Sequence, residues 1–201
     1  MKTLYSLLFL LVSAQVQASE LPPCPDTQTL ISEMVKKYQG PPNAEQIKQT
    51  MKKRMTNCFG STELITDMEY VGEWKDGNFH GEGKSVDKNK NKYEGQFINN
   101  FKDGFGEMVF VTGGSYKGEW KLGEPNGQGT FISNSGEKFV GGFRGSQWFG
   151  QGTLTLLDGN NITGLWYESN FVPALCERAG IPQSSPEHSK CIMRYMNKID
   201  E

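Results

Sequence analysis

Two histidines and a few recurring carboxylates are the side chains of this 201-residue chain that could serve as acids, bases or metal ligands. His80 and His188 lie far apart in the sequence, and neither has further ligands or a nucleophile at the usual spacing. Asp76, Glu82 and Glu107 could face one another, but acidic side chains on a solvated surface are the commoner arrangement. We therefore expect a protein that is not an enzyme and that holds neither a metal nor a cofactor.

Glycines and lysines can together hold phosphate groups, but their spacing here does not favour it. The Gly-x-Gly pairs lack the following helix and lysine that a phosphate loop requires. One basic cluster, interrupted by Asp87, consists of Lys84, Lys88, Lys90 and Lys92. The chain has 21 Lys and Arg residues against 23 Asp and Glu residues, so its net charge is −2. We expect no nucleic-acid partner and only weak electrostatic attraction to a membrane.

A repeat of 23 residues organises the middle of the chain. Its units start at Tyr70, Tyr93, Tyr116, Phe139 and, as a partial copy, Ile162. In each unit a glycine follows two residues after the start, and a large aromatic residue follows two residues after that. A Gly-x-Gly pair recurs in the same register and begins at Gly81, Gly104, Gly127 and Gly150. Such self-similarity predicts a stack of similar structural units.

Each unit is predicted to form one β-hairpin. The alternation of large apolar and polar residues is typical of a strand, and a turn such as residues 75–78 leads to a second strand that opens with Gly-x-Gly. Glycine beside the rings leaves room for a neighbouring ring to lie on the backbone. The rings expected to stack as a core are Tyr70, Trp74, Tyr93, Phe97, Tyr116, Trp120, Phe139, Phe143 and Trp166. The alternative is an aromatic platform for a sugar, lipid or peptide.

These units resemble the MORN repeat, the membrane occupation and recognition nexus. Its pattern, Tyr-x-Gly-x-Trp followed by His-Gly-x-Gly, is nearly complete from Tyr70 to Gly83. Later copies carry other residues where this pattern has its histidine. The resemblance implies an elongated stack of β-hairpins that contacts proteins, self-associates or attaches to membranes. It also implies that catalysis, where family members have it, belongs to a separate domain.

Helices are predicted on both sides of the repeat array. Asp26 and Asn43 would cap two helices before it, and the apolar stripe of the second would reach Cys58. After the array, Pro173 would start a short helix and Ser185 would cap a longer one. The expected division is a helical cap over residues 19–60, the array over residues 61–172 with a half-repeat strand at residues 61–67, and a second cap over residues 173–201.

The four cysteines lie in the two caps, one pair in each. An antiparallel helical hairpin brings Cys24 beside Cys58, and pairing Cys176 with Cys191 closes the second cap. This connectivity gives the shortest loops of the three that are available. The expected fold is therefore mainly β, α+β overall, with an elongated stack of antiparallel β-hairpins between two disulfide-stapled helical hairpins.

The first 18 residues have the pattern of a signal peptide. Lys2 precedes a largely apolar run over residues 4–12, and Val16 and Ala18 occupy the −3 and −1 positions of a signal-peptidase site. We expect cleavage between Ala18 and Ser19. Export to the periplasm or secretion would provide the oxidising compartment in which paired cysteines persist.

Large apolar residues recur near the hairpin tips, where polar residues would be expected. They are Phe79, Phe101, Pro125, Trp148 and Phe171, with Phe149 beside Trp148. An exposed row of this kind would be a binding strip for a partner or a membrane, since contiguous exposed apolar surface marks contact sites. The alternative is that these rings fold back and close the open end of the sheet.

The leading functional hypothesis is an exported binding or scaffold protein of the bacterial envelope that contacts another protein through the repeat surface. A peripheral membrane or lipid-binding protein is the second hypothesis, and a secreted enzyme with an unrecognised site is the third. Self-association is also compatible with the sequence, because uncovered sheet edges pair with one another.

Overall fold

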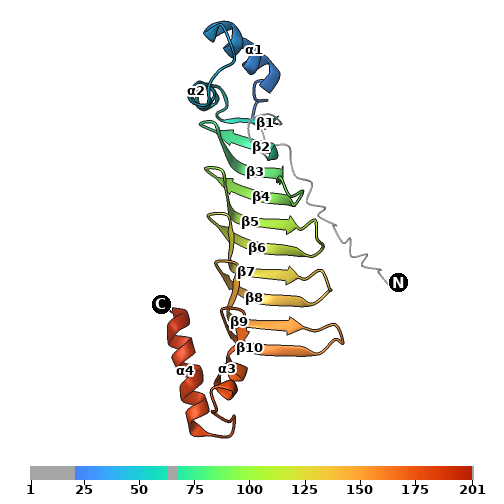
Figure 1. Ribbon diagram of the computed structural model, residues 1–201, viewed down its shortest axis with the longest axis vertical. Helices are drawn as coiled ribbons and strands as arrows, with labels where there is room; N and C mark the ends of the chain where they lie inside the picture. Colours follow the sequence, from blue (N-terminus) through green and yellow to red (C-terminus); the bar gives the residue numbers. More distant parts are fainter. Residues whose placement is uncertain (1–20, 63–67, 201) are drawn as a thin grey trace, which may run out of the picture.

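A computed structural model describes residues 21–62 and 68–200, which form a single elongated sheet with helices at both ends (Figure 1). The predicted signal peptide lies outside these residues. Helices α1 (Thr27–Tyr38) and α2 (Ala44–Arg54) precede the sheet, and α3 (Val172–Arg178) and α4 (Pro186–Asp200) follow it. None of the helices in the described part of the chain is long and apolar enough to cross a membrane.

The described strands pair antiparallel in the order in which they occur in the chain. They are β1 (Cys58–Thr62), β2 (Glu69–Lys75), β3 (Asn78–Val86), β4 (Lys92–Ile98), β5 (Phe101–Val109), β6 (Ser115–Lys121), β7 (Glu124–Ile132), β8 (Lys138–Arg144), β9 (Gln147–Thr155), β10 (Asn161–Tyr167) and β11 (Asn170–Phe171). Each repeat is one hairpin, as predicted, and the fold class inferred from the sequence is confirmed.

Two-residue turns close the hairpins and set their register. In the first turn Asp76 and Gly77 have φ values of 51° and 76°, and both residues of each later turn also have positive φ. Positive φ at both positions matches the right-handed twist of the paired strands. This geometry explains why Asp, Asn, Gly and Ser recur at the turns, whereas Leu122 adopts it with φ of 51°.

A line of glycines crosses the sheet, one in each strand from β1 to β10. Paired in register, they are Gly60, Gly72, Gly83, Gly95, Gly106, Gly118, Gly129, Gly141, Gly152 and Gly164. A Cβ atom on Gly129 would lie 2.6 Å from the ring of Tyr116, and one on Gly106 would lie 2.3 Å from the Tyr93 hydroxyl. At these positions the tyrosine ring lies directly on the glycine backbone, so a Cβ atom would force the ring to shift.

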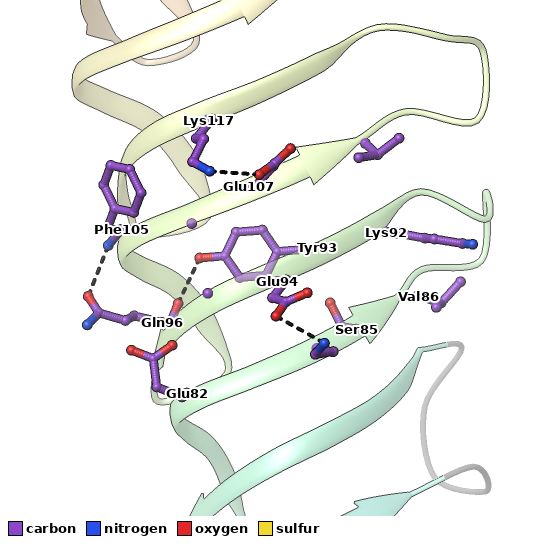
Figure 2. A pocket seen from close by; sticks show the side chains of 14 residues that line it. Glu82, Ser85, Val86, Lys92, Tyr93, Glu94, Gln96, Phe105, Glu107 and Lys117 are labelled. Atoms are coloured by element: carbon purple, nitrogen blue, oxygen red, sulfur yellow. Dashed lines mark hydrogen bonds and ion pairs between the residues drawn. The ribbon is translucent and has the colours of Figure 1, made fainter. Parts of the chain in front are cut away.

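The hydroxyls and indoles of these rings bind backbone carbonyls in a repeating way. Tyr93 Oη donates to the Gln96 carbonyl at 3.0 Å (Figure 2), and Tyr116 Oη donates to the Glu119 carbonyl at 2.8 Å. Trp120 Nε1 donates to the carbonyl of Gly106 at 3.1 Å. In each of the first four units the sheet register shifts just after the first glycine of the glycine line. The tyrosine hydroxyl therefore satisfies a carbonyl at the bulge.

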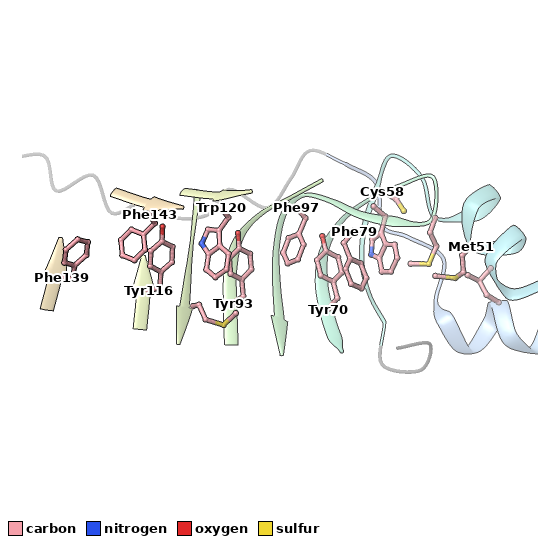
Figure 3. Packing of buried hydrophobic residues seen from close by; sticks show 14 of the residues in the cluster. Met51, Cys58, Tyr70, Phe79, Tyr93, Phe97, Tyr116, Trp120, Phe139 and Phe143 are labelled. Carbon is pink, nitrogen blue, oxygen red and sulfur yellow. The ribbon is translucent and has the colours of Figure 1, made fainter. Parts of the chain in front are cut away.

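All nine predicted core rings are buried on one face, here called the aromatic face. They form a line along the sheet in which neighbouring rings meet edge to face (Figure 3). Tyr93, for example, meets Phe97 with centroids 5.1 Å apart and Trp120 with centroids 5.2 Å apart. Edge-to-face contacts of this kind are favourable beyond the area they bury. The opposite side of the sheet is called the outer face.

The hairpin tips form a second ladder of hydrogen bonds from one repeat to the next. The amide of Asn100 donates to the Phe79 carbonyl at 3.1 Å, and the amide of Gly123 donates to the Lys102 carbonyl at 2.9 Å. The Ser146 amide repeats this contact in the next unit, at 3.1 Å. Because bulges bend strands, the tips turn out of the plane of the main sheet and stack on one another.

The N-terminal helices are capped as the sequence predicts. The Asp26 carboxylate accepts from the Thr29 amide, and Asn43 and Gln46 form a reciprocal capping box. Cys24 and Cys58 form the predicted disulfide. The prediction that Cys58 extends the stripe of the second helix is wrong.

The helix α2 ends at Arg54, and Cys58 opens β1 instead. The described half-repeat strand thus starts three residues earlier than expected, and residues 63–67 of the predicted segment lie outside the described residues. Residues 22–24 cover part of the free edge of β1, where the Cys24 amide donates to the Phe59 carbonyl at 2.8 Å.

The C-terminal helices close the other end of the sheet. The short helix α3 starts at Val172, one residue before Pro173, and the Cys176–Cys191 disulfide joins it to α4. Helix α4 packs against β9 and β10 through a separate apolar cluster that includes Leu165 on the outer face. Its last turn is held by Arg144, whose guanidinium donates to the Ile199 carbonyl at 2.5 Å.

Candidate interaction groove

The outer face of the sheet carries charged side chains, several of which form ion pairs with one another. A hollow of about 880 Å³ on this face spans strands β3 to β6 (Figure 2). Lys84 pairs with Glu94 at 3.0 Å and Lys117 with Glu107 at 3.1 Å across this surface. Phe105, 54% exposed, is its prominent apolar residue. Exposed ion pairs of this kind contribute little binding energy, because water screens them.

The aromatic face has a hollow of about 540 Å³, here called the aromatic groove. Its floor consists of buried core rings, and its walls are half-buried side chains from the tips and from the opposite ends of the strands. The lining residues are Lys102, Met108, Phe110, Tyr116, Trp120, Gly123, Pro125, Phe131, Phe143, Ser146, Trp148 and Ser169. Partly accessible rings beside a few polar groups are typical of a binding surface.

A second hollow of about 910 Å³ lies on the same face at the N-terminal end. It is bounded by α2, which contributes Ile47 and Met51, and by Trp74 and Phe79 of the first hairpin. The charged residues that line it are Lys48, Lys52 and Asp76. Together the two hollows give the aromatic face an apolar surface along the repeats with more positive than negative charge.

The tip residues predicted as a binding row contribute to the aromatic face in different ways. Phe79 is buried and stacks on Tyr70, with centroids 3.9 Å apart. Trp148 is half-buried and stacks on Phe139 at 4.2 Å. Phe171 is half-buried and tilts against Trp166 at 5.3 Å. These three rings fold back onto the core, which is the arrangement that the sequence left as the alternative.

Phe101 and Phe149 lie away from the aromatic groove. Phe101 is 50% exposed. Phe149 packs against Tyr167, with centroids 5.0 Å apart, and the Arg144 guanidinium lies 4.4 Å from its ring centroid. The six apolar tip residues therefore do not form one continuous exposed strip.

Lys102 is the groove residue that the sequence analysis missed. Counting nine residues from each unit start gives Phe79, Lys102, Pro125, Trp148 and Phe171, so Lys102, and not Phe101, is the true member of this row. Its ammonium lies 5.5 Å from the Tyr93 centroid and 5.3 Å from the Trp120 centroid. Burial lowers the pKa of Lys102, and the more distant charge of Asp87 partly opposes this shift.

The histidines and carboxylates considered for catalysis do not converge. His80 lies in the first hairpin, where its backbone carbonyl accepts from Tyr70 Oη at 3.2 Å. His188 is buried in α4, with Nδ1 3.1 Å from the Ile181 carbonyl. Within the described residues, no three His, Cys, Asp or Glu side chains are grouped so that they could hold a metal ion.

Comparison with known families agrees with the observed repeat. The family model of the MORN repeat matches residues 70–92, 93–115 and 116–138, which are three consecutive units of the array. No curated protein matches the chain. Repeats of this family are generally modules for protein or membrane interaction and are typically non-catalytic. The hairpins that start at Phe139 and Ile162 lie beyond the matched residues and continue the same sheet. The chain thus contains three MORN repeats, extended by further hairpins of the same geometry.

Proposed function

We propose that this protein is an exported, non-enzymatic binding protein of the bacterial envelope that holds a segment of another protein in its aromatic groove. The observation that carries the proposal is the groove itself, where half-buried Phe110, Phe131 and Trp148 stand over a floor of rings. Apolar surface that remains accessible in a folded chain is characteristic of contact sites, and aromatic residues dominate their binding energy.

The location part of the proposal is supported by two features. The first 18 residues have the sequence of a cleavable signal peptide, and all four cysteines are paired in two disulfides. Disulfides persist in oxidising compartments such as the periplasm. Mass spectrometry of the protein from its native host tests export, because the mature chain is expected to begin at Ser19. An N-terminus that retains residues 1–18 would contradict it.

The groove is tested by affinity capture from an envelope extract with two matched variants. Phe131→Ser removes a ring from the groove, and Ser85 already occupies the equivalent position of the first unit. Phe105→Gln removes a ring from the outer face, where the third and fourth units have Gln128 and Gln151. Both variants should fold as the wild type does, which thermal unfolding checks. A captured partner should be lost with Phe131→Ser and retained with Phe105→Gln.

A lipid-binding role is the second candidate, favoured by exposed apolar residues at neighbouring tips. Phe101 is 50% exposed and Leu122 is 65% exposed, and the backbone of Gly123 lies beside the Phe101 ring. Co-flotation of the mature chain with vesicles of anionic and zwitterionic phospholipids tests this role. Binding to vesicles that is lost in a Phe101→Ser, Leu122→Ser double variant would favour it over protein binding through the groove.

A further inference from the structure

The aromatic groove contains a single kind of charge, and it comes from one side chain. Lys102 is the charged residue among those that line the groove, and its ammonium lies near the rings of Tyr93 and Trp120. The attraction between a cation and ring faces compensates only part of the hydration free energy that the cation loses on burial. The position of Lys102 therefore leaves a cation directed at whatever occupies the groove.

The structure offers Lys102 no carboxylate partner. Among the residues that the structure describes, the ion pairs join other lysines and Arg54 to glutamates on the outer face or in the N-terminal helices. Asp87 influences Lys102 only through space, without an ion-pair contact. A desolvated cation without its counter-charge costs folding free energy, so its presence calls for a reason outside folding.

The repeat shows that the fold does not require a cation at this position. The equivalent residues in other units are Phe79, Pro125, Trp148 and Phe171, and all of them pack without a charge. An apolar side chain at position 102 would match this pattern. The presence of Lys102 in the groove is thus best explained by a role in binding a ligand.

We propose that the segment held in the aromatic groove is an amphipathic stretch of a partner protein that places an Asp or Glu carboxylate against Lys102. Its apolar side chains would contact the accessible rings, among them Phe131. This inference rests on the proposed function and adds the chemistry of the partner. Lys48 and Lys52 outnumber Asp76 in the neighbouring hollow, so the charge along this face also favours an acidic segment. A carboxylate–ammonium bond is strong where water is excluded.

The test uses peptides selected from a random phage-displayed library on the mature wild-type protein. Peptides that bind wild type but not Phe131→Ser are groove binders. For each of them, its Asp and Glu residues are changed to Asn and Gln, and affinities are measured for wild type, Lys102→Met and Lys117→Met. Met at position 102 matches the apolar residues of the other units, and Lys117→Met removes a cation from the outer face as the control.

The proposal predicts that one acidic residue recurs among the groove binders. For wild type and for Lys117→Met, the peptide with the amide should bind at least about tenfold more weakly than the acidic peptide. For Lys102→Met, the two peptides should bind with nearly equal affinity. Groove binders without a shared acidic residue, or with an amide effect that is equal in all three proteins, would overturn the inference and leave the proposed function intact. If no selected peptide depends on Phe131, the proposed function fails and this inference fails with it.

Discussion

At the scale of the residue, the buried tyrosines make the stability of the repeat array depend on pH. Burial raises the pKa of Tyr70, Tyr93 and Tyr116 above the ordinary value of 10.0. Each hydroxyl also donates to a backbone carbonyl, which requires its proton. The stabilisation that depends on these protons is complete below pH 10. It is lost as the pH rises further, because the unfolded chain then releases protons that the folded chain retains.

We therefore predict that the protein unfolds in alkali and that Tyr116→Phe reduces this sensitivity. Phe139 shows that the repeat accommodates a ring without the hydroxyl. At neutral pH the variant should lose about 1 kcal/mol with its hydrogen bond to Glu119. Denaturant unfolding of both proteins from pH 7 to pH 11 measures the difference. If the two proteins differ in free energy of unfolding by the same amount from pH 7 to pH 11, Tyr116 is not a source of the sensitivity to alkali.

The glycine line is expected to be sensitive to substitution by any residue with a Cβ atom. Gly129→Ala would place a Cβ atom 2.6 Å from the Tyr116 ring, which is fixed between a hydrogen bond and two ring contacts. Overpacking of this kind costs about 1–3 kcal/mol. The control is Gly40→Ala, where no atom lies within 4 Å of the new Cβ. Equal thermal stability of the two variants would show that the packing of the Tyr116 ring does not require glycine at position 129.

At the scale of the element, the sequence predicted the hairpins and the caps of the two N-terminal helices well, because their signals are local. Asn43 and Gln46 already specify a capping box by their spacing, and Asp76-Gly77 already specifies a tight turn. The bend of the hairpin tips was not predicted, since it depends on bulges between paired strands and on hydrogen bonds such as Asn100 to Phe79. These contacts join different repeats, so no spacing within one unit reveals them.

The C-terminal disulfide is predicted to stabilise its cap locally. Cys176 and Cys191 are separated by 15 residues, a loop whose closure contributes about 3 kcal/mol in the chain-entropy model. A Cys176→Ser, Cys191→Ser variant should therefore lose hydrogen-exchange protection in α3 and α4. Strands β2 to β8 should keep theirs, because α4 packs on β9 and β10. Uniform loss of protection across the sheet would contradict this division.

At the scale of the whole molecule, the sequence predicted an elongated array but did not decide between an exposed row of apolar tip residues and tip rings that fold back onto the sheet. In the structure Phe79 and Trp148 return to the core, and the accessible surface is a groove between the tips and rings such as Phe131. The groove has a geometric cause that the strand pattern does not contain. A strand pattern assigns side chains to two faces, whereas a bent hairpin brings its tip over one of them.

We propose that the aromatic groove, and not the outer face, holds a protein. Photo-crosslinking in cells of the native host distinguishes the two faces, with p-benzoylphenylalanine in place of Phe131 in the groove or Phe105 on the outer face. Both substitutions replace one ring by another, so the fold should be kept. We predict a crosslink to one protein from position 131 and none from position 105. The same product from both positions, lipid alone from position 131, or no product would contradict binding of a protein in the groove.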